Sequence, residues 1–409
     1  ILELLISNVS LLLTMDPSAG GKLGEIRGVS IAFDGGKVAW IGSAGEAPDA
    51  DRVVDGSGLI GMPGLVDCHT HSLFAGSRAD EFRRRLGGVD YTEILEQGGG
   101  ILSTVAATRS ASSSTLASIL RERLEERLLQ GVTTVEIKSG YGLDVETELR
   151  MLRILSEGEW PVEVSRTFLG AHAIPKEWRH DRDGYVKLVL DEMLPAAAKL
   201  ADQVDVYCDR GAFTVDESEE ILTKGIALGL SGRIHAEQIE HTGATEMAAR
   251  VGALSADHLE RLDDRGIQAM ADAGMVAVLL PGARLYLRDP NPPVAELVEA
   301  GVDIAIATDF NPGSSPVRDL LACATLACVE FRLSIEDALI GVTRNAARVL
   351  GRESVGWLGV GSAGDMALFA PPAGEPTEYA TLIQYMGGHR ARVVVQNGRL
   401  VVDNGSLVG

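Results

Sequence analysis

Short apolar runs alternate with longer amphipathic stretches through the middle of the chain. The apolar runs span four to seven residues, a length that is typical of buried β-strands. Eight strands are predicted in this way, at residues 65–68, 133–137, 163–169, 203–208, 232–235, 253–257, 275–279 and 303–307.

Helical stretches separate these strands. The clearest covers residues 116–130, where glutamate and arginine recur at helical spacing and Gly131 ends the pattern. Further helices are predicted at 216–228, 243–251 and 293–300. Because parallel strands need helical crossovers, the eight strand–helix units predict an α/β fold of the (β/α)8 TIM-barrel type. A doubly wound sheet is the alternative, but no G-x-G-x-x-G motif follows an early strand.

The two ends of the chain have a different pattern, with short strands and glycine turns. These strands are predicted at 4–13, 30–33, 38–41, 53–55, 365–369, 392–396 and 400–402. We therefore expect residues 1–61 and 362–409 to fold together into a small β-sandwich domain. It would lie beside a catalytic barrel formed by residues 62–361.

Composition limits the partners of this protein. The chain has 409 residues, 45% of them hydrophobic, which is enough for one large domain and a smaller one. Lysine and arginine number 37 against 58 acidic residues, so the formal net charge is −21. Such a surface repels nucleic acid and anionic membranes, and we expect neither as a partner. No apolar stretch reaches the about 18 residues that a membrane helix needs.

Cysteine usage and the first residues bear on the compartment. The four cysteines show no C-x-x-C spacing, so we expect reduced, buried thiols rather than a disulfide framework. Cys68 could be a metal ligand, but its side chain should point opposite to that of His69, which favours core packing. Residues 1–8 lack the basic region of a signal peptide. We expect a cytoplasmic protein.

The placement of the histidines gives the first chemical signal. His69 and His71 follow the first barrel strand, and residues i and i+2 of an extended segment point to the same face. Their imidazoles can bind one ion, and imidazole suits Zn²⁺ and Fe²⁺. His172, His235 and His258 also lie at strand ends, where barrel enzymes carry their catalytic residues. The other three histidines, His180, His241 and His389, are expected on the surface or in loops. Of these, His241 could approach the site from its loop.

Asp309 follows the eighth strand and completes a candidate ligand set. An aspartate at a strand end is often a helix cap, but the converging histidines favour a fourth ligand. His69, His71, His235 and Asp309 would then bind one divalent ion and leave a position for water, as catalytic sites do. The ion would lower the pKa of that water. Asp309 could accept its proton, and His258 could donate a hydrogen bond to the developing oxyanion.

This ligand layout resembles that of the metal-dependent amidohydrolases, and the local motifs are closer still to the imidazolonepropionase family. The motifs run through the whole barrel and are highly specific when taken together. H-x-H alone is shared with many deaminases and dihydroorotase-like enzymes. The matching stretches are 67–78 (DCHTHSLFAGSR), 98–101 (GGGI), 136–143 (EIKSGYGL), 169–175 (LGAHAIP), 235–238 (HAEQ), 253–259 (ALSADHL) and 308–316 (TDFNPGSSP).

The resemblance implies hydrolysis of the cyclic amide C–N bond of 4-imidazolone-5-propanoate to N-formimidoyl-L-glutamate, a step of histidine degradation. It also implies the same four metal ligands, one divalent ion of zinc or iron, and a homodimer. Arg78 would bind the substrate carboxylate bidentately, with a salt bridge to Asp80 or Glu81 as the alternative. The other substrate contacts implied by the resemblance are Tyr141, His172, Gln238, Asn311, Gly313 and Ser314.

Three points stay open in the sequence. A strand-end lysine such as Lys138 bridges two metals in some amidohydrolases, but the matching lysine of the family that this chain resembles is not a ligand, so we expect a supporting role. Arg284 stands where that family usually has an aromatic residue, and it could be solvated or contact the substrate carboxylate. A ring deaminase would share the metal ligands and is the alternative activity, which release of ammonia would reveal.

Overall fold

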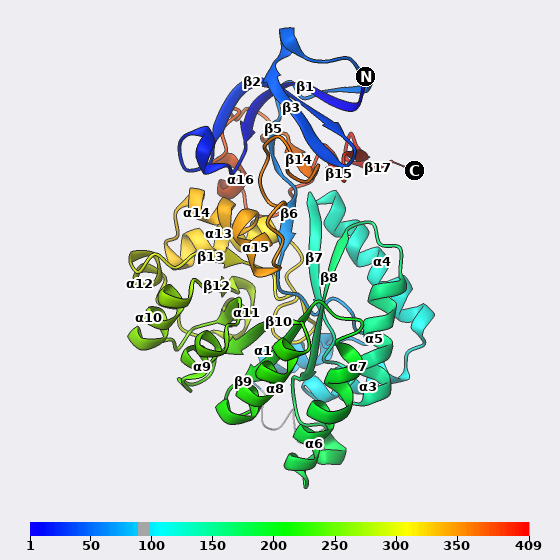
Figure 1. Cartoon of the computed structure of the whole chain (residues 1–409), viewed down its shortest axis with the longest axis vertical. Coiled ribbons are helices and arrows are strands. Elements are labelled where there is room, and N and C mark those ends of the chain that lie inside the picture. Colours follow the sequence, from blue (N-terminus) through cyan, green and yellow to red (C-terminus); the bar gives the residue numbers. More distant parts are fainter. Residues whose placement is uncertain (89–98, 409) are drawn as a thin grey trace.

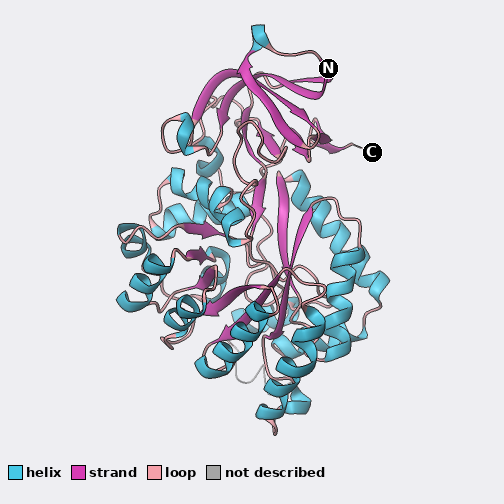
Figure 2. Cartoon of the chain, viewed as in Figure 1, coloured by secondary structure: helices cyan, strands magenta, loops and turns pink. Residues whose placement is uncertain are grey.

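The computed structural model describes residues 1–88 and 99–408 of the chain. Figure 1 shows a larger unit of strands and helices, with a smaller unit at one end that contains both chain termini. Figure 2 shows that this smaller unit consists mainly of strands, whereas helices surround the strands of the larger one. Gly98, the first residue of the 98–101 motif, lies outside the described residues.

The larger unit is built on one sheet of eight parallel strands in sequential order. They are β6 (Leu65–Asp67), β7 (Val132–Lys138), β8 (Glu163–Ala171), β9 (Gln203–Cys208), β10 (Ser231–Ala236), β11 (Ser255–His258), β12 (Val276–Leu279) and β13 (Ile304–Ile306). Every residue of β7 is buried, as expected for a parallel strand covered on both faces.

The two outer strands of this sheet meet just beyond their carboxyl ends. Thr70 and Phe310 form a parallel bridge. The Asp309 amide donates to the His69 carbonyl at 3.0 Å, and the His71 amide donates to the Phe310 carbonyl at 3.0 Å. The sheet therefore closes into a barrel through the segments that carry the candidate ligands. The predicted (β/α)8 fold is confirmed, including all eight strands.

Helices connect the barrel strands and cover the sheet (Figure 1). Ser112 caps one of them by accepting from the Thr115 amide, and Thr214 and Glu217 form a capping box on another. None of the helices in residues 1–88 and 99–408 is long and apolar enough to cross a membrane. The helices are α1 (Ala79–Leu86), α3 (Ile101–Ser110), α4 (Ser113–Leu129), α5 (Val145–Glu157), α6 (Arg182–Leu188), α7 (Leu194–Ala197), α8 (Val215–Ala227), α9 (Ala244–Val251), α10 (Asp264–Ala273), α11 (Pro281–Leu287), α12 (Val294–Glu299), α13 (Leu320–Phe331), α14 (Ile335–Gly341), α15 (Arg344–Val349) and α16 (Thr381–Gln384).

The smaller unit is a mixed sheet of nine strands from both ends of the chain. Its centre is β14, which pairs antiparallel with β5 on one side and with β15 on the other, so the two ends of the sequence share one ladder. This confirms that the terminal segments fold together. The strands are β1 (Leu2–Leu13), β2 (Glu25–Asp34), β3 (Lys37–Ser43), β4 (Ala50–Asp55), β5 (Ile60–Pro63), β14 (Met366–Phe369), β15 (Val393–Gln396), β16 (Arg399–Asp403) and β17 (Ser406–Leu407).

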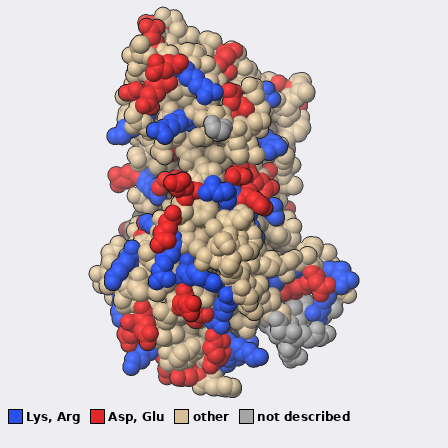
Figure 3. Space-filling view, turned by 90° about the vertical axis from the view of Figure 1, so that its right-hand side faces the viewer, with Lys and Arg blue, Asp and Glu red and all other residues tan. Residues whose placement is uncertain are grey.

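The acidic surplus of the sequence does not form a single patch on the face shown in Figure 3, where acidic and basic side chains are interspersed. Many ion pairs join the two kinds of side chain, such as Arg182 with Glu217 and Arg166 with Asp202. The net charge of −21 therefore acts as a diffuse field over this face rather than as a docking patch.

Candidate metal and substrate site

Three imidazoles meet at the carboxyl end of the barrel. His69 and His71 lie just after β6, and His235 lies in β10. One ring nitrogen from each lies within 4.8 Å of the others, and the three residues are 0%, 3% and 3% exposed. Nε2 of His69 is buried and makes no hydrogen bond to any described residue. A buried nitrogen of this kind suits a cation as its partner.

Asp309 lies beside two of the three imidazoles. Its Oδ1 is 3.5 Å from Nε2 of His69 and 3.4 Å from Nε2 of His71. Two ligands about 2.1 Å from a tetrahedral ion lie about 3.4 Å from each other, so the donor set fits a metal such as zinc. Burial raises the pKa of the Asp309 carboxyl, against the opposing effect of His258 and His235.

Two buried aspartates hold the imidazoles from behind. Nδ1 of His69 lies 2.6 Å from Oδ2 of Asp257, and Nδ1 of His235 lies 3.1 Å from the Asp205 carboxylate. A carboxylate at Nδ1 directs Nε2 towards the centre of the cluster and increases its basicity. These two aspartates are not among the site residues predicted from the sequence. A signal was present, because each is a charged residue inside an apolar strand.

His258 lies beside the cluster in an unusual backbone conformation. Its φ is 85°, and its ring centroid is 5.5 Å from that of His235 and 6.0 Å from that of His69. Burial lowers the pKa of His258 to about 3, so the imidazole is neutral at physiological pH. Its Nδ1 has no hydrogen-bond partner among the described residues, and Oε2 of Glu260 is 3.9 Å away.

Aromatic side chains form one wall of the site. The His172 ring stacks on that of His71, with centroids 5.0 Å apart, and Nδ1 of His172 is 2.9 Å from the Gly140 carbonyl. The Tyr141 ring lies 5.8 Å from His71 and 5.6 Å from His172. Glu148 accepts from three amides of the loop at 140–143, which fixes the backbone around Tyr141.

Arg78 lies at the edge of the site and is already paired. Its Nε and Nη2 donate to the two carboxylate oxygens of Glu81, each at 2.5 Å, whereas Asp80 pairs with Arg83. Nη1 donates to Oγ1 of Thr104 at 3.4 Å, and Gly313 lies so close that a Cβ there would be 3.0–3.2 Å from the guanidinium. The salt bridge considered as the alternative for Arg78 is therefore present, but it occupies only Nε and Nη2 and leaves Nη1 with the long hydrogen bond to Thr104.

The loop after β13 is organised by one amide side chain. Oδ1 of Asn311 accepts from the amides of Gly313 and Ser314, at 2.9 and 2.8 Å. Its Nδ2 donates to the Asp309 carbonyl and to Oγ of Ser314, both at 2.8 Å. The structure thus brings all three predicted loop residues together beside Asp309.

Gln238 lies on the loop after β10. Its Oε1 accepts from the Tyr207 hydroxyl at 2.9 Å. The Asp209 carboxylate accepts from the Gln238 amide and from the Ile239 amide, both at 2.8 Å, and so holds the loop in place.

The remaining candidates take other roles. Nζ of Lys138 lies 2.9 Å from Glu136 and 2.8 Å from Asp205, so this fully buried side chain contacts carboxylates. Nη1 of Arg284 pairs with Glu330 of α13 at 2.9 Å. Cys68 is buried in an apolar cluster, as predicted.

His241 lies on the surface, as predicted. The side chain is 43% exposed, with Nδ1 3.3 Å from Glu237 and Nε2 3.5 Å from Asp263. Each ring nitrogen therefore has a carboxylate partner, and we read the group as a surface ion-pair network.

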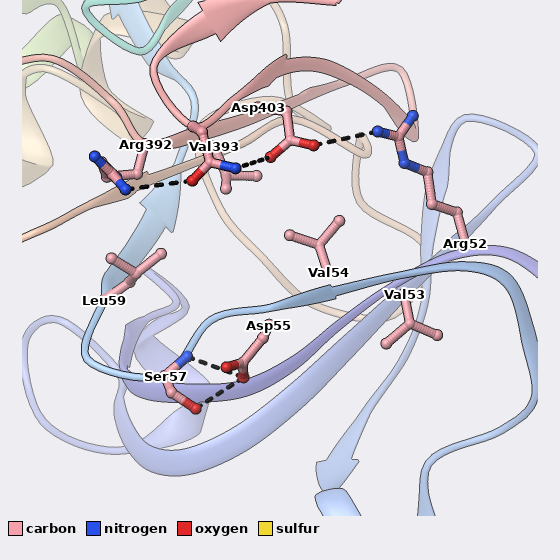
Figure 4. Close-up of a pocket in the computed structure, with 10 residues that line it drawn as sticks. Arg52, Val53, Val54, Asp55, Ser57, Leu59, Arg392, Val393 and Asp403 are labelled. Atoms are coloured by element: carbon pink, nitrogen blue, oxygen red, sulfur yellow. Dashed lines mark hydrogen bonds and ion pairs between the residues drawn. The ribbon is translucent and has the colours of Figure 1, made fainter.

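A cavity of about 500 Å³ in the smaller unit is a separate feature (Figure 4). Arg52 and Arg392 line it, but Arg52 pairs with Asp403 at 3.3 Å and Arg392 with Asn404 at 3.2 Å. Its charged groups satisfy one another, and none of its lining residues is a histidine or cysteine. The chemistry therefore belongs to the histidine cluster.

Sequence comparison gives the same picture over nearly the whole chain. The profile of the amidohydrolase family matches residues 83–402. An imidazolonepropionase of Shewanella sp. (strain ANA-3) is 47% identical over 400 residues, which cover 95% of this chain and 96% of that protein. An imidazolonepropionase of Shewanella oneidensis is 46% identical with the same coverage.

Solved structures with this fold include other hydrolytic enzymes. The atrazine chlorohydrolase of Arthrobacter aurescens TC1, crystallised with zinc, has a TM-score of 0.70 at 20% identity and covers 99% of this chain and 96% of its own. An adenosine deaminase from Xanthomonas campestris with bound zinc has a TM-score of 0.74 at 18% identity, covering 100% and 94%. At these identities the likeness concerns the fold.

Proposed function

The chain belongs to the amidohydrolase family and, within it, to the imidazolonepropionases, and we propose that the histidine cluster is its catalytic centre. The reaction is hydrolysis of the cyclic amide C–N bond of 4-imidazolone-5-propanoate to N-formimidoyl-L-glutamate, in histidine degradation. One observation carries the assignment of the centre. The unpartnered Nε2 of His69 and the Asp309 carboxylate face each other, fully buried, at the closure of the barrel.

We assign four ligands to one divalent ion, either zinc or iron: His69, His71, His235 and Asp309. The buried nitrogens and the 3.4–3.5 Å spacing of Asp309 from two of the imidazoles support this set. When bound, the ion would supply a Lewis acid that acidifies water and polarises a carbonyl. Burial and Arg233 act to lower the pKa of Lys138, but Asp205, Glu136 and Asp257 together hold it above its usual value. Lys138 therefore stays an ammonium and is not available to be carboxylated as a bridge to a second metal.

Asp309 and His258 move and hold the protons in this proposal. A carboxylate oxygen of Asp309 takes a proton from the attacking water and passes it to the ring nitrogen that leaves. A ring N–H of the neutral His258 donates to the carbonyl oxygen as that oxygen gains negative charge. The low pKa of His258 supports this role, because the imidazole gains no second proton near pH 7 and so keeps one nitrogen free of charge.

The other residues bind and orient the substrate. Arg78 presents its Nη1 edge to the propanoate carboxylate, while Glu81 holds the guanidinium from the opposite side. His172 and Tyr141 pack against the ring. Gln238, Asn311, Gly313 and Ser314 complete the pocket from the loops after β10 and β13.

A direct assay tests the activity and its centre together. The purified protein is mixed with 4-imidazolone-5-propanoate, and the loss of ultraviolet absorbance and the release of ammonia are both followed. We expect absorbance loss without ammonia in the wild type and in the control Asp34→Asn, which changes the exposed last residue of β2. Asp309→Asn should be inactive. Stoichiometric ammonia would identify a deaminase instead, and an active Asp309→Asn would remove Asp309 from the mechanism.

We further propose that the enzyme works as a homodimer in the cytoplasm. The family supports the dimer, and the four cysteines, all free thiols, are consistent with a reducing compartment. We propose residues 62–361 as the catalytic domain and residues 1–61 with 362–409 as the accessory domain.

A further inference from the structure

Five charged side chains lie together inside the barrel, beneath the imidazoles. They project from β7, β9, β10 and β11, and each is 0% exposed. Two of them are the aspartates behind His69 and His235, but the proposed chemistry gives the two cations no role, and burying so many charges is costly unless they are paired. They are Glu136, Lys138, Asp205, Arg233 and Asp257.

One arm of this network ends on His69. Nη2 of Arg233 lies 2.6 Å from Oδ2 of Asp257, and the same oxygen is 2.6 Å from Nδ1 of His69. Nη1 of Arg233 donates to the Cys68 carbonyl at 2.7 Å, next to His69 in the chain. Ser255 donates to the other oxygen of Asp257 at 2.7 Å and accepts from Nε of Arg233 at 3.2 Å. The aspartate cannot rotate without breaking several of these contacts.

A second arm ends on His235. Nζ of Lys138 lies 2.8 Å from Asp205, which in turn is 3.1 Å from Nδ1 of His235. Lys138 also pairs with Glu136 at 2.9 Å. The other oxygen of Glu136 accepts from the Thr70 amide at 3.0 Å, between His69 and His71. The two arms meet at Glu136, which is also 3.5 Å from Arg233.

We propose that Arg233 and Lys138 are positioning residues for the metal: each anchors the aspartate that orients one ligand imidazole. This inference rests on the proposed ligand set. Oδ2 of Asp257 is held between Arg233 and Nδ1 of His69. In Asp205, Oδ2 is ion-paired with Lys138 and Oδ1 lies at Nδ1 of His235. Each carboxylate is thus anchored by a cation on one side and sets the plane of the ring on the other. Without the arginine or lysine side chain, the aspartate would remain buried with its charge uncompensated. It would therefore move to another partner, and the ligand imidazole bonded to it would move as well.

The charges of the network also match the ion. Arg233 and Lys138 offset two carboxylates, while the network and Asp309 together contain four. The surplus of two negative charges equals the charge of one divalent cation. The buried cations thus limit the surplus to what a single ion neutralises, in addition to fixing the ring orientations.

Metal affinity measured apart from activity tests this proposal. Zn²⁺ dissociation constants are determined by competition with a chromophoric chelator, and the melting temperature of the metal-free protein is recorded in parallel. We expect Arg233→Met and Lys138→Met each to weaken Zn²⁺ binding by about 10- to 100-fold. Arg166→Met is the matched control, because it removes a guanidinium from β8 whose partner Asp202 touches no histidine. The control should keep the wild-type dissociation constant.

The outcomes separate this inference from the proposal beneath it. His235→Ala tests the ligand set itself, and wild-type Zn²⁺ affinity in that variant would overturn the set. If His235→Ala loses the metal while Arg233→Met and Lys138→Met bind Zn²⁺ as the wild type does, the cations serve folding alone and the inference is wrong. The inference is also wrong if these two variants have a lower melting temperature but an unchanged Zn²⁺ dissociation constant. If Lys138→Met does not fold, Lys138→Gln, which keeps a polar side chain, is measured in its place.

Discussion

Gly313 controls the position of Arg78, and replacing it tests how the substrate carboxylate is bound. A Cβ at this position would lie 3.0 Å from Nη1 of Arg78 and 3.2 Å from its Cζ and Nη2. These distances are several tenths of an ångström too short, so one of the two groups has to yield. Arg78 cannot slide away freely, because Glu81 holds two of its nitrogens at 2.5 Å and is itself fixed by the Gly100 amide at 3.0 Å.

The size of the effect follows from what a tilted guanidinium loses. A methyl group against Nη1 turns the edge that the carboxylate would use, so about one of two charge-assisted hydrogen bonds is lost. Such a bond contributes about 1.5–3 kcal/mol. Gly313→Ala should therefore lower kcat/KM by about ten- to a hundredfold. The change should appear mainly in KM, because the carboxylate is remote from the breaking bond and is held equally in ground and transition states.

Steady-state kinetics with two substrates make this test specific. The ultraviolet assay is run on the wild type, on Gly313→Ala and on Gly45→Ala, where a Cβ meets nothing within 4 Å. An imidazolone without the propanoate chain serves as the second substrate, and with it Gly313→Ala should match the wild type. A wild-type KM for the full substrate in Gly313→Ala, together with an unchanged KM in Arg78→Ala, would refute carboxylate binding by Arg78.

Three further predictions concern the centre itself. Asp309→Asn should lower kcat by at least about 10³-fold, as expected for loss of a general base, with little change in melting temperature; measurable turnover near the wild-type rate would argue against it. Removing the metal with a chelator should abolish activity and lower the melting temperature, and Zn²⁺ at about 1,000 times its dissociation constant should restore about 4 kcal/mol of stability; calorimetry that detects no shift would contradict the site. Burial lowers the pKa of His258 to about 3 in the folded state. In the unfolded chain the pKa is about 6.5, so below that pH only the unfolded chain binds this proton. Between pH 8 and pH 5 the free energy of unfolding of the metal-free wild type should therefore fall by about 2 kcal/mol more than that of His258→Gln. Denaturant titrations at both pH values measure this difference, and parallel curves for the two proteins would show that His258 titrates normally.

The strands of the barrel could be predicted because burial on both faces leaves a direct trace in the sequence. A strand such as β12, predicted at 275–279 and observed at Val276–Leu279, is a short apolar run with no competing periodicity. The rim position of the histidines followed from the same reasoning, since parallel strands present their carboxyl ends at one edge. Local chemistry and strand counting were therefore sufficient for the fold and for the general place of the site.

The support beneath the site could not be predicted, because it depends on pairing across the barrel. His69 and Asp257 are 188 residues apart, and only the closure of eight strands brings them to 2.6 Å. In the sequence, Arg233 is a charged residue two positions before His235, and its ion-pair partner cannot be identified from local pattern. Arg284 illustrates the same limit: its pairing with Glu330 depends on how α11 packs against α13, which no local pattern encodes.

Buried carboxylates also explain how an acidic protein can order a site for an anionic substrate. Glu148 accepts from backbone amides around Tyr141, and Asp209 accepts from those at Gln238. Each carboxylate is matched by N–H dipoles of a neighbouring loop, so its charge is largely satisfied locally and orders that loop. Glu81 does the same for Arg78 and for the Gly100 amide. The negative charges nearest the substrate loops thus act as structural anchors, and the Nη1 edge of Arg78 remains available to a carboxylate.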